Sequence, residues 1–286
     1  MPDGIIIIDK PQGWTSMDVC AKLRGVFREK RVGHAGTLDP MATGVLPVFV
    51  GRATRAVQFA ENGKKEYLAV LKLGLVTDTQ DTTGIVLESF PVNADADAVR
   101  AVLPRFTGEL EQLPPMYSAL KVNGQKLCDL ARRGREVERK PRTITVYALE
   151  LLDQPAPDEF SLRIVCSKGT YVRTLCHDIG RQLGCGGCMA ALRRTMAAGF
   201  TIDEAVTLSQ AQERGAELLT PVDAYFRDRP RFTLQNETQE KRAYNGNPFH
   251  ARGLADGDWR IYDRAGRFLA LSHAEGGEVR PIKNFF

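Results

Sequence analysis

The stretch that most constrains this chain is residues 33–44, GHAGTLDPMATG. It holds glycines at 33, 36 and 44. Glycine permits positive φ angles and lets another backbone, or a ligand, approach closely. Pro40 keeps Asp39 out of the helical region and so fixes the direction of its side chain. The stretch therefore predicts a tight, non-periodic turn that presents one acidic side chain. In the alternative interpretation, Asp39 only caps the following turn through its carboxylate.

Regular elements are expected on both sides of this turn. Residues 5–8 form a β-branched run bounded by Gly4 and Pro11, which predicts a buried strand. A helix is expected next, because Thr15 or Ser16 can cap it and apolar residues then recur at helical spacing. Further strands are expected at 45–50, 67–73, 85–88, 143–152, 160–166 and 192–195, and helices at 52–61, 95–103 and 172–183.

The order of these elements indicates the fold class. Strands and helices interleave without a regular βαβ rhythm, so the sequence predicts an α/β chain of the α+β type with a mixed, largely antiparallel sheet. A composition change near residues 228–230 predicts a boundary between domains 1–229 and 230–286. The tail has short strand-like runs at 259–262, 268–271 and 279–282, typical of a small β-rich domain.

Composition limits the class of protein further. The chain has 286 residues, of which 43% are hydrophobic and 26% charged, an ordinary globular balance. The apolar run near its start is too short to span a bilayer and lacks a secretory cleavage pattern. We therefore expect a cytoplasmic protein without membrane contact, in which the six cysteines stay reduced.

Basic residues concentrate in one segment. Residues 121–142 contain eight Lys and Arg against three Asp and Glu, although the net charge of the chain is only +4. Such an excess can attract a polyanion such as a nucleic acid. The alternative interpretation is a solvated helix face.

Several common chemistries find no support in the motifs. There is no GxGxxG after a strand, no P-loop and no HExxH. Cys185 and Cys188 have the spacing of zinc ligands, but a zinc site usually needs a second such pair. The sequence favours buried thiols, and it predicts no metal and no cofactor.

Separated motifs give the chain a family resemblance. Besides GHAGTLDPMATG, it contains DKPQGWTS (9–16), KKEYLAVLKLGLVTDTQDTTG (64–84), PPMYSALKVNGQKLCDLARRGREVERKPR (114–142), SKGTYVRTLCHDIG (167–180) and ALRRT (191–195). In this order and spacing, they resemble the bacterial type of the TruB family, the tRNA pseudouridine-55 synthases. The resemblance covers about the first 225 residues. The tail more loosely resembles the PUA-like RNA-binding domain of that family.

The resemblance implies an activity and a partner. The family isomerises a uridine in the T loop of tRNA, which is flipped out of the loop; its base is detached, rotated and rejoined to the sugar through C5. This reaction is redox-neutral and needs no cofactor. The implied partner is the T stem-loop of tRNA, bound by a monomer without an obligatory protein partner.

The resemblance also assigns roles to three catalytic residues. Asp39 matches the essential carboxylate, and whether it attacks the sugar or removes a proton from it stays open. Arg173, in GTYVRT, matches the ion partner of that carboxylate. Tyr67 matches the aromatic residue that lies against the flipped uracil, although it could also be an ordinary core residue of its strand.

Five further residues are predicted to bind RNA. His34 matches the residue that inserts into the opened loop, and Tyr171 and Leu192 match residues that line the pocket. Lys10 supports the active-site loop or contacts RNA. Gly36 belongs to the turn that aims Asp39.

Two other functions remain open at this level. The chain could be an RNA chaperone that refolds tRNA without chemistry. It could also be a guide-RNA-dependent pseudouridylase of the related archaeal and eukaryotic type.

Overall fold

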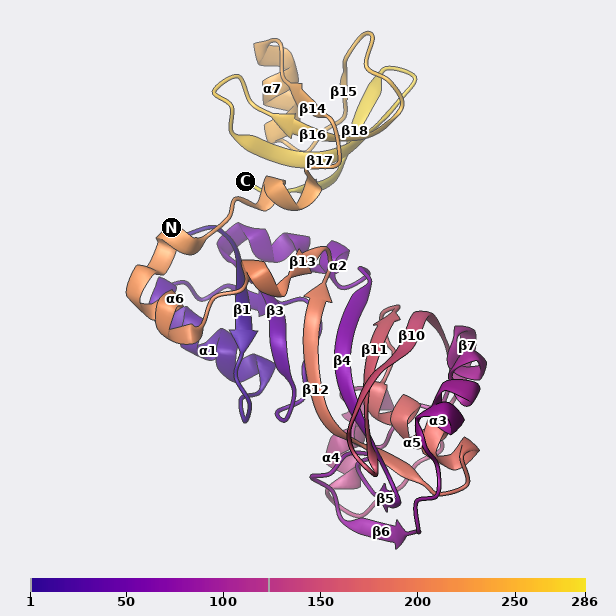
Figure 1. Ribbon diagram of the computed structural model, residues 1–286. Helices are drawn as coiled ribbons and strands as arrows, with labels where there is room; N and C mark the ends of the chain where they lie inside the picture. The colour runs from indigo at the N-terminus through magenta and orange to yellow at the C-terminus, as the bar shows by residue number, and fades with distance from the viewer. Residues whose placement is uncertain (1, 123) are drawn as a thin grey trace.

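The computed structural model describes residues 2–122 and 124–286. It consists of a body built on a nine-stranded sheet and a tail built on a five-stranded sheet (Figure 1). The seven strands on the main path of the large sheet are, in spatial order, β1 (Gly4–Lys10), β3 (Thr43–Val50), β12 (Gly187–Ala197), β4 (Lys65–Leu73), β11 (Glu159–Cys166), β10 (Arg142–Ala156) and β7 (Gly108–Gln112). The short strands β2 (Val32–His34) and β13 (Phe200–Thr201) pair with β3 and β12.

This sheet is mixed but mostly antiparallel, as the sequence predicted. Within its described strands the one parallel contact joins β3 to β12, where Thr43 pairs with Arg193 and Gly44 with Arg194. We call this contact the β3/β12 seam. The seam connects the amino-terminal strands β1, β2 and β3 with the rest of the sheet. The turn 33–44 ends at this seam.

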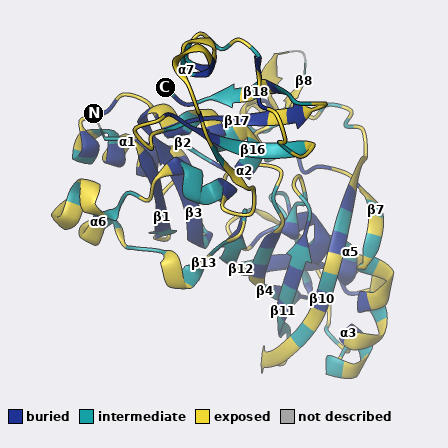
Figure 2. Cartoon of the chain, turned by 90° about the horizontal axis from the view of Figure 1, so that it is seen from above, coloured by how far each residue is buried: buried dark blue, intermediate teal, exposed yellow. Residues whose placement is uncertain are grey.

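The strands before the seam are covered mainly by helix α1 (Ser16–Phe27). This helix begins with a capping box, in which the Asp18 N–H donates to Thr15 Oγ1 and the Thr15 N–H donates to Asp18 Oδ2. Its apolar face packs on Ile6 and Ile8 of β1 and on neighbouring residues of β3. The cap and the helix were predicted, and the burial of β1 and β3 is visible in Figure 2.

Two helices cover the strands beyond the seam. Residues of α3 (Ala96–Val102) and α5 (Val172–Gln182) share one apolar cluster with β4, β10, β11 and β12. Alternate residues of β4 are buried, as expected for a strand with one covered face. The carboxy-terminal end of β10 is exposed (Figure 2).

Smaller elements lie at the rim of the body. They are α2 (Val57–Ala60), α6 (Leu208–Arg214), the hairpin of β5 (Leu75–Thr77) and β6 (Val86–Ser89), the hairpin of β8 (Lys121–Val122) and β9 (Gln125–Lys126), and α4 (Leu127–Ala131). The basic segment 121–142 therefore comprises the second hairpin, α4 and the chain that leads into β10. No helix in the described part of the chain is long and apolar enough to cross a membrane.

The tail has its own sheet, in the order β14 (Arg231–Thr233), β16 (Gly257–Tyr262), β17 (Phe268–Glu275), β18 (Glu278–Asn284) and β15 (Phe249–His250). The three strands predicted there, β16 to β18, are confirmed. Helix α7 (Glu237–Tyr244) and the short strands β14 and β15 were not predicted. Phe226 packs against Phe268 and Phe285, so the tail and the body share an apolar core.

Candidate active site

The turn that carries Asp39 is fixed by the beginning of α1. Ser16 Oγ accepts a hydrogen bond from the Leu38 N–H at 2.9 Å and lies 3.2 Å from the Leu38 carbonyl oxygen, to which it can donate. The Gly13 N–H donates to the Pro40 carbonyl at 2.8 Å. The residues on both sides of Asp39 are thus anchored, so the backbone that presents its side chain is held from both directions.

Lys10, predicted as a support or an RNA contact, lies beneath this turn. Its side chain is fully buried, and Nζ donates to the carbonyls of Trp14 at 2.7 Å, Pro11 at 2.9 Å and Pro40 at 3.4 Å. Burial lowers the pKa of Lys10 from 10.5 to about 8, and the nearby Asp39 carboxylate opposes this shift. Because no atom of Lys10 is exposed, its place fits the supporting role and not direct contact with RNA.

Asp39 and Arg173 form the ion pair that the sequence predicted. Arg173 Nε lies 3.0 Å from Asp39 Oδ2; the arginine side chain is 6% exposed and the carboxylate side chain 38%. Arg173 also donates to the carbonyls of Thr79 at 3.0 Å and Tyr117 at 2.8 Å. A carboxylate that is accessible on one side is therefore held by an immobile cation on the other.

A second carboxylate, Asp81, supports the same arginine. Asp81 Oδ2 lies 3.7 Å from Arg173 Nη1, and Asp81 Oδ1 accepts from the hydroxyls of Thr79 and Thr83. Asp81 is buried. It cannot reach a substrate directly, so Asp39 is the accessible acid of the pair.

Tyr67 and Tyr171 lie near the Asp39 carboxylate. Tyr67 on β4 and Leu192 on β12 belong to one apolar cluster with Leu38, which precedes Asp39 in the turn. Tyr171 precedes α5; its N–H donates to Gln112 Oε1 at 2.8 Å, and Gln112 Nε2 donates to its carbonyl at 3.0 Å. Burial raises the pKa of both tyrosines, and the Asp39 charge adds to each shift. The two phenols are neutral at pH 7 and lie within the field of the carboxylate.

Gly36 and His34 occupy the other end of the turn, near a buried arginine, Arg194. Gly36 has a φ of +89°, and its carbonyl accepts from Arg194 Nη2 at 3.0 Å. Burial and the charge of Arg194 lower the pKa of His34 below 6.5, so its ring is neutral at pH 7. Gly33 differs from the prediction: it has no positive φ, because it continues β2 and pairs with Phe49.

Sequence reasoning missed four supporting residues. They are Ser16, Asp81, Gln112 and Arg194. Asp81 and Arg194 stand within the motifs KKEYLAVLKLGLVTDTQDTTG and ALRRT, so a signal was present for these two. For Ser16 the sequence indicates only a helix cap, and nothing near Gln112 singles that residue out.

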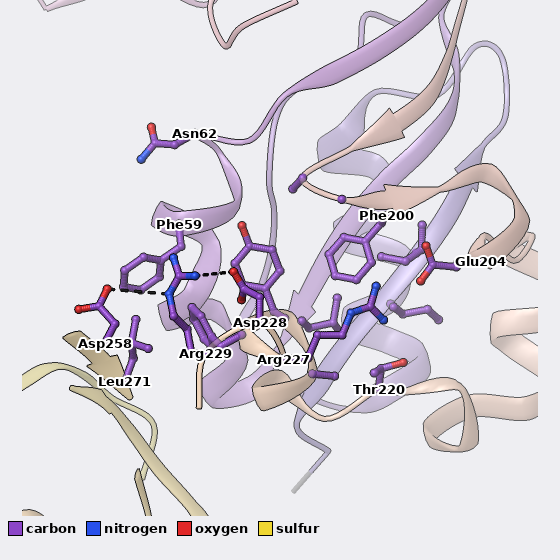
Figure 3. Close-up of a pocket in the computed structure, with 18 of the residues that line it drawn as sticks. Phe59, Asn62, Phe200, Glu204, Thr220, Arg227, Asp228, Arg229, Asp258 and Leu271 are labelled. Atoms are coloured by element: carbon purple, nitrogen blue, oxygen red, sulfur yellow. Dashed lines mark hydrogen bonds and ion pairs between the residues drawn. The ribbon is translucent and has the colours of Figure 1, made fainter. Parts of the chain in front are cut away.

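The part of the chain that the structure describes offers no cluster of metal ligands at this site. No group of three or more His, Cys, Asp or Glu in the described ranges could hold a metal ion. Cys185 and Cys188 are buried, and burial raises the pKa of Cys188 to about 11, so its thiol is protonated. A cavity of about 680 Å³ lies elsewhere, between body and tail; Figure 3 shows Arg229 there, paired with Asp228 and Asp258.

Comparison with known proteins defines the class. Residues 24–172 match the amino-terminal domain of the TruB family pseudouridylate synthases, and residues 173–226 match the tRNA pseudouridylate synthase B C-terminal domain. A crystal structure of a Cbf5-Nop10-Gar1 complex superposes with a TM-score of 0.72 at 27% identity, covering 99% of this chain and 85% of that one. The mixed sheet is thus that of the pseudouridine synthase fold.

Individual relatives narrow the class to a family. tRNA pseudouridine synthase B of Clostridium kluyveri is 39% identical, with 99% of both chains covered. The proteins of the same name from Aromatoleum aromaticum and Syntrophomonas wolfei are 45% and 44% identical and cover 98% and 99% of this chain, and 91% and 98% of their own. The chain belongs to the TruB family and is an isomerase of the tRNA pseudouridine synthase B type.

Proposed function

We propose that this enzyme converts the uridine at position 55, in the T loop of tRNA, into pseudouridine, with Asp39 as its catalytic carboxylate. The bond between N1 and the sugar breaks, the uracil rotates, and a bond from C5 to the same sugar carbon forms. C5 loses a proton and N1 gains one, so no electrons are exchanged. The observation that carries this proposal is the half-exposed Asp39 carboxylate held at 3.0 Å by the buried Arg173.

One accessible carboxylate is sufficient for this chemistry. Glycosidic bonds are usually cleaved by two carboxyl groups, one of which acts as an acid on the leaving group. Uracil can leave as a delocalised anion, so a strong acid is less necessary. The burial of Asp81 supports a division of labour in which Asp39 meets the ribose and Asp81 fixes Arg173.

The aromatic surroundings of Asp39 support a flipped-out base. Extrusion of a nucleotide costs a few kcal/mol, and stacking on an aromatic ring returns ~1–3 kcal/mol per base. We assign this stacking to Tyr67 and the walls of the pocket to Tyr171 and Leu192. His34, neutral at pH 7, would fill the gap in the loop with a flat ring.

RNA binding would use a wider surface. We propose that the basic segment 121–142 contacts phosphates of the T stem, and that residues 1–229 form a catalytic domain and residues 230–286 a PUA-like RNA-binding domain. Most of the affinity would then come from phosphate contacts and fall with salt. We expect the enzyme to act as a monomer without a protein partner.

The deciding experiment maps modified positions on tRNA transcribed in vitro and treated with the purified protein. The wild type should modify position 55 and release tritium from uracil labelled at C5. Asp39→Asn should abolish release while tRNA binding persists, and Asp97→Asn, which alters an exposed carboxylate on α3, should match the wild type. An active Asp39→Asn enzyme would refute the catalytic assignment. An inactive wild type that still refolds tRNA would favour the chaperone function.

A second candidate function has a structural observation in its favour. A structure described as an H/ACA RNP bound to a substrate RNA containing 2′-deoxyuridine also superposes, with a TM-score of 0.72 at 25% identity over 99% of this chain and 85% of that chain. This likeness allows a guide-RNA-dependent enzyme. Activity on bare tRNA without any added RNA or protein would exclude it.

A further inference from the structure

Arg194, on β12, is a fully buried cation without a carboxylate partner in the described part of the chain. Its relative exposure is 0%. Nε donates to the Val45 carbonyl at 2.7 Å and Nη2 to the Gly36 carbonyl at 3.0 Å, whereas Nη1 is buried and has no hydrogen-bond partner among the described residues. An unpaired buried charge with an unused donor lowers stability, and an apolar side chain of similar volume would often serve a fold better. A role beyond folding is therefore needed to explain this residue.

The turn 33–44 is shaped around this arginine. A Cβ atom at Gly36 would lie 3.4 Å from Arg194 Nη1, and one at Gly44 would lie 2.2 Å from the Arg194 carbonyl oxygen. Both glycines have positive φ angles, of +89° and +100°. The turn therefore contacts Arg194 at two places: Gly36 lies against its guanidinium, and Gly44 lies against its backbone.

Arg194 also faces Tyr67. The two residues are paired across the antiparallel strands β12 and β4, so both side chains leave the same face of the sheet. The positive charge of Arg194 opposes the rise that burial imposes on the pKa of Tyr67. One side chain is therefore close to the turn that carries Asp39 and to the phenol assigned to the flipped base.

We infer that Arg194 is a positioning residue for the proposed reaction, which holds the Asp39 turn against β12 and whose unpaired Nη1 is the donor available to the hydroxyl of the cross-strand Tyr67. This inference rests on the proposed function. Arg194 touches neither the ribose nor the base. It acts by fixing the relative position of the carboxylate and the phenol, so its loss should slow the chemical step and leave tRNA affinity unchanged.

The test compares Arg194→Met, Arg194→Lys and a double-mutant cycle with Tyr67→Phe, using single-turnover rates at saturating enzyme. Arg194→Met should reduce the rate roughly 10- to 100-fold, the scale of loss when reacting groups are displaced by about 1 Å, with an unchanged Kd for tRNA. Arg194→Lys should be faster than Arg194→Met, because it keeps the charge and one donor. In the Tyr67→Phe background, Arg194→Met should cost less than in the wild type, because the hydroxyl it orients is already absent. Arg100→Met is the matched control, since Arg100 is exposed on α3 and pairs there with Asp97; its rate should equal that of the wild type.

Several results would overturn the inference. An active wild type with an Arg194→Met rate within about twofold of it, a loss confined to Kd, or strictly additive effects in the cycle would each do so. Circular dichroism and thermal melting check folding, and if Arg194→Met does not fold, Arg194→Lys enters the cycle in its place. A wild type that does not modify uridine would overturn the proposed function as well, which separates the two failures.

Discussion

Arg173 shows how a single residue can link two carboxylates of unequal exposure. Its guanidinium contacts Asp39 and Asp81 and donates to two backbone carbonyls, so four contacts fix its plane. Asp39 gains a rigid partner without being buried itself. Removing the arginine would leave Asp81 as an uncompensated charge in the interior.

Arg173→Met should therefore destabilise the protein by about 3–5 kcal/mol, the usual cost of breaking a buried ion pair. The measurement is urea-induced unfolding at neutral pH. Arg173→Met/Asp81→Asn should recover part of the loss, because the amide carries no charge. A loss below about 1 kcal/mol, the range of exposed pairs, would mean that the contact contributes little.

Lys10 gives a pH-dependent prediction at the same scale. Its pKa is about 8 in the folded protein against an ordinary value of 10.5. Between these two values the unfolded chain binds more protons than the folded one, so folding stability rises with pH. The penalty is fully present below about pH 8 and is relieved as the pH approaches 10.5.

The wild type should accordingly gain up to about 3 kcal/mol of unfolding free energy over Lys10→Met as pH rises through this window. Urea unfolding of both proteins at several pH values between these limits measures the difference. Lys22→Met, at an exposed site on α1, is the control and should track the wild type. A Lys10→Met difference that stays constant with pH would contradict the assigned titration.

At the scale of elements, the β3/β12 seam determines the conformation of the turn. Gly44 pairs with Arg194 in parallel, at a φ of +100°, and a Cβ there would lie 2.2 Å from a backbone oxygen. Gly33 belongs to the same stretch of sequence but has no positive φ, and a Cβ added there would meet no atom within 4 Å. Position 44 therefore has no room for a side chain, whereas position 33 can accept one.

Gly44→Ala should destabilise the protein by more than about 2 kcal/mol, because strain and a backbone clash coincide, and it should also reduce activity. Gly33→Ala should change stability by less than about 0.5 kcal/mol, as expected of a substitution away from such features. Thermal and urea unfolding of the two variants measure the change in the free energy of unfolding. Equal losses of stability at both positions would show that the β3/β12 seam is not what requires glycine at position 44.

The elements also show what a sequence can predict. Helix α1 was predictable because Thr15 can cap it and apolar residues then recur at helical spacing. The Asp39–Arg173 pair came from the family resemblance and not from local pattern. Helix α7 was missed because it is polar, and it is recognisable mainly by the cap of Asn236.

Residues whose roles depend on distant contacts were not predictable. Ser16 meets Leu38 across 22 positions, and Arg194 meets Gly36 across 158. No periodicity or local spacing encodes such contacts. For Gly33, the positive φ that a glycine-rich turn permits is not adopted, because β2 pairs with β3.

At the scale of the whole molecule, the tail is attached through an aromatic contact. Phe226 meets Phe59 of the body and Phe268 and Phe285 of the tail, and Arg55 donates to the carbonyls of Asn284 and Phe286. Both parts contribute to the same buried cluster. Their stabilities should therefore be coupled.

Phe226→Ala should cost about 3–5 kcal/mol, as for large-to-small substitutions in a core, and should expose the tail to limited proteolysis near residues 227–230. Cleavage followed by gel electrophoresis gives the readout. Unchanged protease resistance would indicate that the tail is held by other contacts.

The basic segment makes a prediction about the intact complex. Lys126 and Arg133 line a hollow beside the hairpin of β8 and β9. If both contact phosphates, Lys126→Gln/Arg133→Gln should lower the slope of log K against log salt by about 1.4 to 1.8. Filter binding of tRNA at several salt concentrations measures this, and an unchanged slope would remove these two residues from the RNA surface.

The seam between β3 and β12 has a consequence for how the enzyme is made. Arg194 reaches the Val45 carbonyl across 149 positions of sequence, so Asp39 leaves the ribosome long before the strand that gives its turn a shape. A nascent chain that lacks β12 contains Asp39 but lacks the contacts that orient its carboxylate. Catalytic competence should thus arise late in synthesis, in a single step, once the partner of Gly44 has emerged.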